Sequence, residues 1–350
     1  MKVGILGATG AVGQKFIRLL QNHPWFEIVV LGASERSAGK SYEAAANWVE
    51  DVPLPDDMAR MQVQLTEPKY FDGVDFVFSG LDSAVATEVE GAFARAGIPV
   101  ISNAKNYRMQ ENVPLLVPEV NPDHIELIKT QDFTSDCNGW IVTNPNCVAV
   151  PLSMALKPLH DAFGIKSIIM TSLQAISGAG YPGVASLDIL GNVIPFISGE
   201  EPKIAPETRK LLGQLNDSSV EHLDFNLQAT ATRVPTLNGH MISVTVEFEQ
   251  KPTNLNTLEQ AFLNWKNPIS GLDLPSSPKE VIKLHKNDRF PQPRLHADHE
   301  GGMQLHVGRL REAEVFHASF VCMAHNTIRG AAGGAILNAE LLVNKGYLKS

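Results

Sequence analysis

The sequence predicts an α/β protein in which an N-terminal Rossmann-type parallel sheet precedes an α+β domain with a mixed or antiparallel sheet. The first part of the chain alternates short apolar runs with helical patterns, which is typical of crossover units around a parallel sheet. After about residue 150, long alternating β-branched runs follow with few helices between them. The 350 residues, 44% of them hydrophobic, suffice for two cores.

Buried apolar runs and amphipathic runs fix the elements of the first part in order. Residues 3–6 predict a strand and residues 12–20 the helix after it. Both are short enough to fit one crossover unit. Further strands are predicted over 26–31, 74–78, 98–101 and 140–143, with a helix over 84–96.

The second part begins with a predicted helix over 148–163 and a long strand over 165–175. The Ala-, Gly- and Leu-rich segment from 326 to 343 predicts a helix that packs back on the first domain. We therefore expect a nucleotide-binding domain at 1–147, completed by residues 326–350, and a second domain at 148–325. Its other strands are predicted over 230–234, 241–248, 304–307 and 315–322.

Charge and cysteine content exclude several classes of protein. The net charge of -9 argues against a nucleic-acid partner, because no basic stripe could displace counterions from phosphates. Three scattered cysteines are too few for a disulfide framework or a zinc site, so no metal is expected. No apolar run has the length of a membrane span, and the chain opens on a strand pattern without a signal segment. We expect a soluble, cytoplasmic protein.

A glycine motif, Gly-Ala-Thr-Gly-Ala-Val-Gly, ends the first strand and opens the first helix. Such glycines permit a tight turn, and the helix N-terminus offers amides to a pyrophosphate. An ordinary glycine-rich turn is the alternative, but the position between strand and helix favours a dinucleotide site. The predicted cofactor contacts here are Gly7, Thr9, Gly10, Ala11, Val12 and Gly13.

The residues at the end of the second predicted strand indicate whether the cofactor is NAD or NADP. Ser34, Arg36 and Ser37 stand where NAD sites usually carry an acidic residue. A hydroxyl and a guanidinium suit a 2′-phosphate, so NADP is predicted. Glu35 could itself be the acidic residue of an NAD site, and a solvated loop is the plainer alternative.

Cys147 lies where a buried strand ends and a helix begins. The helix dipole should lower its pKa, and amides there could hold an oxyanion. Cys322, in an apolar strand, is instead expected to be a small buried hydrophobe, and Cys137 a loop residue whose acidic neighbour raises its pKa. A thiolate beside a nicotinamide can attack a carbonyl to give a thiohemiacetal, which then loses hydride to the cofactor. The resulting thioester is taken by phosphate or water. His240 is the best candidate base, although a lone histidine is more often structural.

Together these motifs resemble the aspartate-β-semialdehyde dehydrogenases, from residue 1 to about 345. Residues 102–108 and 192–196 look like the archaeal and fungal branch of that family. A departure from the family pattern lies at 296–302, outside the expected active site, and puts local loop structure or oligomer contacts in doubt. The motifs that carry the resemblance are 7–13, 144–147, 174–180, 233–240 and 326–332.

The resemblance implies roles for individual residues. Cys147 is the implied nucleophile, His240 the acid/base and Gln174 the residue that orients substrate. Arg233 is implied to clamp the substrate carboxylate, consistent with bidentate guanidinium recognition. The remaining implied contacts are Asn146 to substrate, Glu207 to its ammonium, Lys210 and Arg108 to its phosphate, and Ser79, Gly80, Ser177, Gly178, Asn326 and Thr327 to the cofactor.

The choice of Glu207 and Lys210 is open, because Glu200 and Lys203 have the same spacing on a helix. The function implied is NADPH-dependent reduction of L-4-aspartyl phosphate to L-aspartate 4-semialdehyde, in lysine, methionine and threonine biosynthesis. The second domain would bind substrate and form a homodimer or homotetramer. Malonyl-CoA and acylated glutamyl-phosphate reductases are rival enzymes, and a redox sensor that binds NADPH without turnover is a rival of another class.

Overall fold

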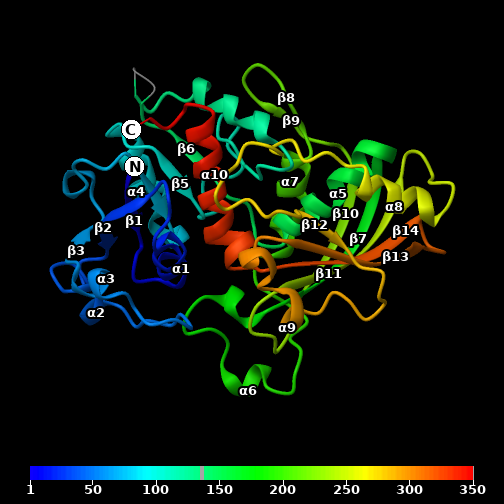
Figure 1. Ribbon diagram of the computed structural model, residues 1–350, viewed down its shortest axis with the longest axis horizontal. Helices are drawn as coiled ribbons and strands as arrows, with labels where there is room; N and C mark the ends of the chain where they lie inside the picture. Colours follow the sequence, from blue (N-terminus) through cyan, green and yellow to red (C-terminus); the bar gives the residue numbers. More distant parts are fainter. Residues whose placement is uncertain (135–137, 350) are drawn as a thin grey trace.

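The computed structural model describes residues 1–134 and 138–349, which form two large sheets side by side (Figure 1). The blue-to-cyan first part of the chain builds one sheet, and the green-to-orange part builds the other. The red C-terminal helix lies between them. Cys137, predicted to be a loop residue, lies outside the described residues. The predicted α/β class with two different sheets is confirmed.

The first sheet has the strand order β3-β2-β1-β4-β5-β6, and every neighbouring pair is parallel. The order reverses between β1 and β4, which is where open parallel sheets bind ligands at the carboxyl ends of their strands. The edge strand β3 was not predicted, since three residues carry too little pattern. The strands are β1 Lys2–Leu6, β2 Glu27–Ala33, β3 Val63–Leu65, β4 Phe76–Ser79, β5 Val100–Ser102 and β6 Ile141–Thr143.

Helix α1 (Ala11–Leu20) begins directly after the glycine motif, because Gly7 has a φ of +73° and turns the chain at the end of β1. A Cβ at Gly13 would lie 2.3 Å from the Gly7 carbonyl oxygen, so only glycine lets α1 pack this closely. The apolar face of α1 enters the core, where Phe16 stacks 4.8 Å from Phe78. The other helices here are α2 Tyr42–Ala45, α3 Asp56–Arg60 and α4 Ser83–Arg95, with 3₁₀ helices η1 Pro68–Tyr70 and η2 Pro122–Thr130.

The second sheet is mixed, with the order β10-β7-β11-β14-β13-β12. Its two outer pairs, β10 with β7 and β12 with β13, are parallel, and the three inner pairings are antiparallel. Two short strands, β8 Gln214–Leu215 and β9 Val220–Glu221, form a separate hairpin. The strands are β7 Ile165–Gln174, β10 Asn226–Arg233, β11 His240–Phe248, β12 Ile282–Leu284, β13 Leu305–Glu312 and β14 Ala318–Ala324.

One face of the second sheet is covered and the other is open. Helix α5 (Ala149–Phe163) packs its apolar residues in one core with β7, β11, β13 and β14, beside α7 (Glu201–Leu211) and α8 (Leu255–Leu263). Side chains of the opposite face of β7, such as Ile169, remain exposed. The sheet therefore has a face that no part of the described chain buries. The remaining short helices are η3 Ile176–Ala179, α6 Ser186–Ile189, α9 Pro293–His296 and η4 His299–Gly302.

The C-terminal segment returns to the first sheet. After β14, a π-helical turn η5 (Ile328–Ala332) leads into α10 (Gly333–Asn344), whose side chains belong to the same core as β1 and α1. Arg329, 1% exposed, donates 2.8 Å to the fully buried Glu119 and forms a second, shorter contact with the same carboxylate. The segment between the sheets is thus fixed by a buried ion pair.

The segment 296–302, where the sequence departs from the family pattern, contains the last residue of α9 and all of η4. Glu300 and Gly301 have φ of +50° and +66°. The rings of His285, His296, His299 and His306 pack on one another beside this turn, and Nε2 of His285 lies 3.0 Å from Nδ1 of His306. No cluster that could hold a metal ion is found within residues 1–134 and 138–349.

Candidate active site

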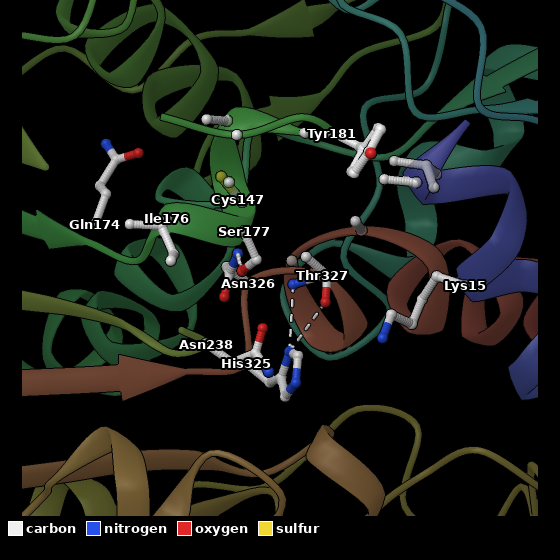
Figure 2. Close-up of a pocket in the computed structure, with 18 of the residues that line it drawn as sticks. Lys15, Cys147, Gln174, Ile176, Ser177, Tyr181, Asn238, His325, Asn326 and Thr327 are labelled. Carbon is white, nitrogen blue, oxygen red and sulfur yellow. Dashed lines mark hydrogen bonds between the residues drawn. The ribbon is translucent and has the colours of Figure 1, made fainter. Parts of the chain in front are cut away.

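A cavity of about 790 Å³ lies where the two halves of the chain meet. Its wall comprises the start of α1, the segment after β7 and the segment between β14 and α10. Figure 2 shows Cys147, Ser177 and Asn326 approaching one another from these different elements, with Lys15 of α1 on the far side. Every catalytic and cofactor prediction can be placed relative to this cavity.

Cys147 opens on the cavity two residues before α5 begins. It lies against Gly330, where a Cβ would come within 2.9 Å of the Cys147 Cβ. Burial and the nearby Glu200 carboxylate raise the pKa of the Cys147 thiol to about 12, although Arg108 and Arg233 act in the opposite direction. The expected lowering of this pKa is therefore wrong, because desolvation outweighs the favourable charges.

Asn146 already binds two backbone amides at the start of α5. The side-chain oxygen of Asn146 accepts hydrogen bonds from the amides of Val148 (2.8 Å) and Ala149 (3.3 Å). Amides at this helix start were predicted to be able to hold an oxyanion, and two of them are already bound by Asn146. The side-chain nitrogen of Asn146 in turn donates a 2.8 Å hydrogen bond to the Glu200 carboxylate.

Glu200 and Lys203 both line the cavity. Oε2 of Glu200 lies 3.2 Å from the Lys203 Nζ, and Oε1 accepts a 3.3 Å hydrogen bond from Gln174. Gln174, at the end of β7, is buried and also donates to Ser172 at 3.2 Å. This places a carboxylate, an ammonium and an amide on one wall of the cavity.

Glu207 and Lys210 do not line the cavity. The ammonium group of Lys210 donates hydrogen bonds to three backbone carbonyls, those of Arg108 (2.9 Å), Gln110 (2.7 Å) and Val113 (2.8 Å). Burial lowers its pKa to about 8, although Glu207 acts in the opposite direction. Glu207 accepts from the Asn146 backbone amide at 2.6 Å and pairs with Arg108 at 3.0 Å. Of the two pairs with the same spacing, the structure brings the Glu200 pair to the cavity.

Arg233 and His240 meet beside Gly178. A Cβ at Gly178 would lie 2.9 Å from the Arg233 guanidinium and 3.0 Å from Nε2 of His240, so glycine is required there. Arg233 donates 2.7 Å to the Ala175 carbonyl. Nδ1 of His240 accepts from the Ala175 amide at 3.1 Å, and its buried Nε2 has no hydrogen-bond partner among the described residues. Burial and Arg233 lower the pKa of His240 to about 3. The ring is neutral with its proton on Nε2. His240 itself does not line the cavity; Gly178, which does, lies between its Nε2 and the cavity.

The predicted cofactor residues fall into three groups. Ala11, Val12, Ser177, Gly178, Asn326 and Thr327 line the cavity. Gly7, Thr9 and Gly10 belong to the turn after β1 and Gly80 to the turn after β4, while Gly13 lies in the first turn of α1 and Ser79 ends β4. A Cβ on Gly7 would lie 2.9 Å from the Gly80 carbonyl. Ser34, Arg36 and Ser37 form an open turn directly after β2.

These residues fit a dinucleotide. No side chain caps the N-terminus of α1 at Gly10, so its first amides are available to an anion. Asn326 accepts from the Gly239 amide and donates to Ser177, both at 2.9 Å, and Thr327 donates to His325 (Figure 2). The inner end of the predicted cofactor path is thus held rigidly beside Cys147.

The cavity also has charged residues that the sequence did not suggest. Lys15 pairs with Glu50 at 2.6 Å. Asp298 lies 3.6 Å from His325 and lines the cavity, so the departing segment 296–302 does reach the active site, contrary to expectation. These pairs join segments far apart in sequence, and no local spacing marks them. Arg18 and Asp51 complete this wall.

Glu90 of α4 is a buried carboxyl group outside the cavity. One of its oxygens accepts from the hydroxyls of Ser79 (2.6 Å) and Ser102 (2.7 Å), which end β4 and β5. The other oxygen has no hydrogen-bond partner in the part of the chain that the structure describes. Burial raises the pKa of Glu90 to about 7, despite the opposing effects of both serines and Arg108. Glu90 therefore ties together the two strand ends that precede predicted ligand-binding loops.

Glu90→Gln should flatten the pH dependence of stability. Because the folded-state pKa lies above the unfolded value of 4.5, the neutral acid stabilises the fold at low pH, and this contribution is lost as pH rises through 7. Glutamine keeps a neutral acceptor at every pH. Between about pH 5.5 and about pH 8.5 the melting temperature should fall less in the variant than in the wild type. Equal falls would contradict the burial argument.

A dinucleotide fold whose cavity is lined by a cysteine and a buried arginine, with His240 packed behind Gly178 of the cavity wall, defines a nucleotide-dependent dehydrogenase with a cysteine at its centre. Residues 2–128 match the family model of the semialdehyde dehydrogenase NAD binding domain, and residues 156–329 match that of the semialdehyde dehydrogenase dimerisation domain. The chain belongs to the aspartate-semialdehyde dehydrogenase family.

Relatives from the two expected branches are similar over nearly their whole length. The aspartate-semialdehyde dehydrogenase of Schizosaccharomyces pombe is 47% identical and covers 99% of each chain. That of Archaeoglobus fulgidus is also 47% identical, over 98% of each. The crystal structure of the Candida albicans enzyme with NADP matches with a TM-score of 0.91 at 41% identity, over 98% of each chain. The predicted likeness to archaeal and fungal members is confirmed.

Proposed function

We propose that this chain is an NADP-dependent enzyme that reduces L-4-aspartyl phosphate to L-aspartate 4-semialdehyde through a thioester on Cys147. The observation that carries the proposal is a cysteine in a cavity that also presents a Glu–Lys pair and a buried arginine, Arg233, which forms no ion pair among the described residues. The names of the full-length relatives support it. In this role the chain would serve lysine, methionine and threonine biosynthesis.

The cofactor proposed is NADP, as in the Candida albicans structure. The α1 N-terminus would hold the pyrophosphate, while Ser34, Arg36 and Ser37 offer hydroxyls and a cation for a 2′-phosphate. Asn326 and Ser177 would position the nicotinamide end, because they line the cavity and hold each other. When bound, the cofactor exchanges a hydride with the carbon attached to the Cys147 sulfur.

The substrate is held through its three charged groups. Arg233 suits the carboxylate, since its guanidinium is buried and forms no ion pair within residues 1–134 and 138–349. Glu200 suits the ammonium, and Lys203 with Arg108 suits the phosphate. We favour Glu200 and Lys203 over Glu207 and Lys210, because the latter two already bind the loop that carries Arg108. Lys210 donates to the Arg108 carbonyl, and Glu207 pairs with the Arg108 guanidinium.

His240 serves as a proton relay. When the Cys147 thiol adds to an aldehyde, Nε2 gives its proton to the carbonyl oxygen and takes up the thiol proton, so the ring ends as it began. The Ala175 amide on Nδ1 fixes the ring in the donating tautomer. Such a relay needs no free thiolate, which agrees with the raised pKa of Cys147. Gln174 would orient the substrate through its amide.

One assay tests the function. Purified protein is mixed with L-aspartate semialdehyde, inorganic phosphate and NADP⁺, and absorbance of the reduced cofactor is followed. We expect reduction only when phosphate is present. Activity with malonyl-CoA and NADPH but none with aspartate semialdehyde would establish the rival reductase, which needs no partner for an ammonium. Cofactor binding without turnover on either substrate would favour the redox sensor.

We also propose a homodimer formed by the second sheet. The open face of β7 and the projecting α6 region expose apolar side chains, including Leu187 (93% exposed) and Phe196 (62%). The match to a dimerisation domain supports this. Sedimentation should give twice the chain mass, and Leu187→Asp with Phe196→Asp should shift it toward one. A mass of four chains would indicate the tetramer instead.

No helix of the described chain is long and apolar enough to cross a membrane, and a cytoplasmic location remains the prediction from sequence.

A further inference from the structure

The cationic side chains that line the cavity differ in whether they already form an ion pair with a carboxylate of the protein. Lys15 and Arg18 pair with Glu50, Lys203 pairs with Glu200, and Arg108 pairs with Glu207. Both terminal nitrogens of Arg108 are used, since the second donates 2.7 Å to the Asn103 carbonyl. A phosphate that met only these groups would have to compete with carboxylates already bound to them.

Lys105 is different. It lines the same cavity, its side chain is exposed, and it forms no ion pair within residues 1–134 and 138–349. It stands three residues before Arg108, on the loop that follows β5. Among the described cavity cations, only Lys105 and Arg233 have no carboxylate partner, and Arg233 is assigned above to the substrate carboxylate.

The loop that carries Lys105 is fixed on both sides. The Ala104 amide donates 3.0 Å to the Ser102 hydroxyl, which Glu90 orients. The Asn106 side chain donates 2.9 Å to the Ser83 carbonyl and 2.6 Å to the Thr87 hydroxyl, both on α4. With its neighbours held on the sheet and on α4, Lys105 is presented toward the cavity by a rigid loop rather than by a mobile one.

We propose that Lys105 is a phosphate-binding residue of this site, which contacts the phosphoryl group of the acyl phosphate and the inorganic phosphate of the reverse reaction. The inference rests on the proposed function. Its chemistry is that of a point charge with three donors, which suits a phosphate dianion. A free ammonium also needs no carboxylate to be displaced when the anion arrives.

Lys105→Met tests the proposal in the direction that consumes phosphate. The KM for phosphate should rise by about tenfold or more, because one charge-assisted contact is lost. The KM values for aspartate semialdehyde and NADP⁺ should change by less than about twofold. Lys105→Arg should restore most of the phosphate affinity, and Lys251→Met, an exposed lysine outside the cavity, should behave as wild type.

A phosphate KM unchanged in Lys105→Met, with turnover retained, would overturn the proposal while leaving the proposed function intact. Calorimetric titration of the wild type and the Met variant with inorganic phosphate gives a reading that does not need turnover. Weaker phosphate binding in the variant supports the proposal, and equal binding refutes it. Failure of the proposed function itself would instead appear as a wild type without phosphate-dependent reduction.

Discussion

Cys147→Ser should abolish turnover, with kcat reduced by about a thousandfold or more, and leave NADPH binding nearly unchanged. Burial already raises the pKa of the Cys147 thiol to about 12, and a buried serine hydroxyl is a still weaker acid and nucleophile. The exchange replaces sulfur by a smaller atom beside Gly330, so the wall of the cavity is preserved.

The measurement pairs initial rates with fluorescence titration of NADPH. Cys322→Ser is the matched control, because this cysteine is fully buried in β14 away from the cavity. Substantial activity in Cys147→Ser, or an equal loss of activity in both variants, would contradict the covalent mechanism.

Arg329→Leu should lower the free energy of unfolding by about 3–5 kcal/mol. The Glu119 carboxylate would be left in a site with no exposed surface and without its cation. Denaturant unfolding followed by circular dichroism measures the loss. Arg60→Leu, which changes an exposed arginine at the end of α3, should have little effect.

The double change Arg329→Leu with Glu119→Leu separates an unpaired charge from lost packing. Removing both charges should recover much of the stability, since buried ion pairs are often replaceable by apolar residues. If the double variant were as unstable as the sum of the single ones, the ion pair would not be the cause.

Periodicity predicted the long elements of the fold well. The helix expected over 12–20 is Ala11–Leu20, and the strand expected over 165–175 is Ile165–Gln174. Both are long enough for a 3.6- or 2-residue period to repeat. Elements of three or four residues, such as β3, β12 and α6, show no repeat, and tertiary pairing alone creates them.

The chemistry of single side chains was predicted less well, because it depends on residues distant in sequence. Glu200 and Glu207 have lysines at the same spacing, and only the packing of Lys210 on the carbonyls of 108–113 separates the two pairs. The thiol pKa was expected to be low because the motif shows only the start of a helix. The burial of Cys147 and the nearby Glu200 carboxylate, which raise this pKa, depend on residues distant in sequence.

Placement of α10 in the first core has a consequence for the order of folding during synthesis. Ile336 and Leu337 complete a core whose β strands were made long before, since β6 ends at Thr143. Domains generally fold as units once all their parts have left the ribosome. The nucleotide-binding half, although synthesised first, should therefore mature last, and nascent chains that stop before residue 333 would bind neither cofactor nor substrate.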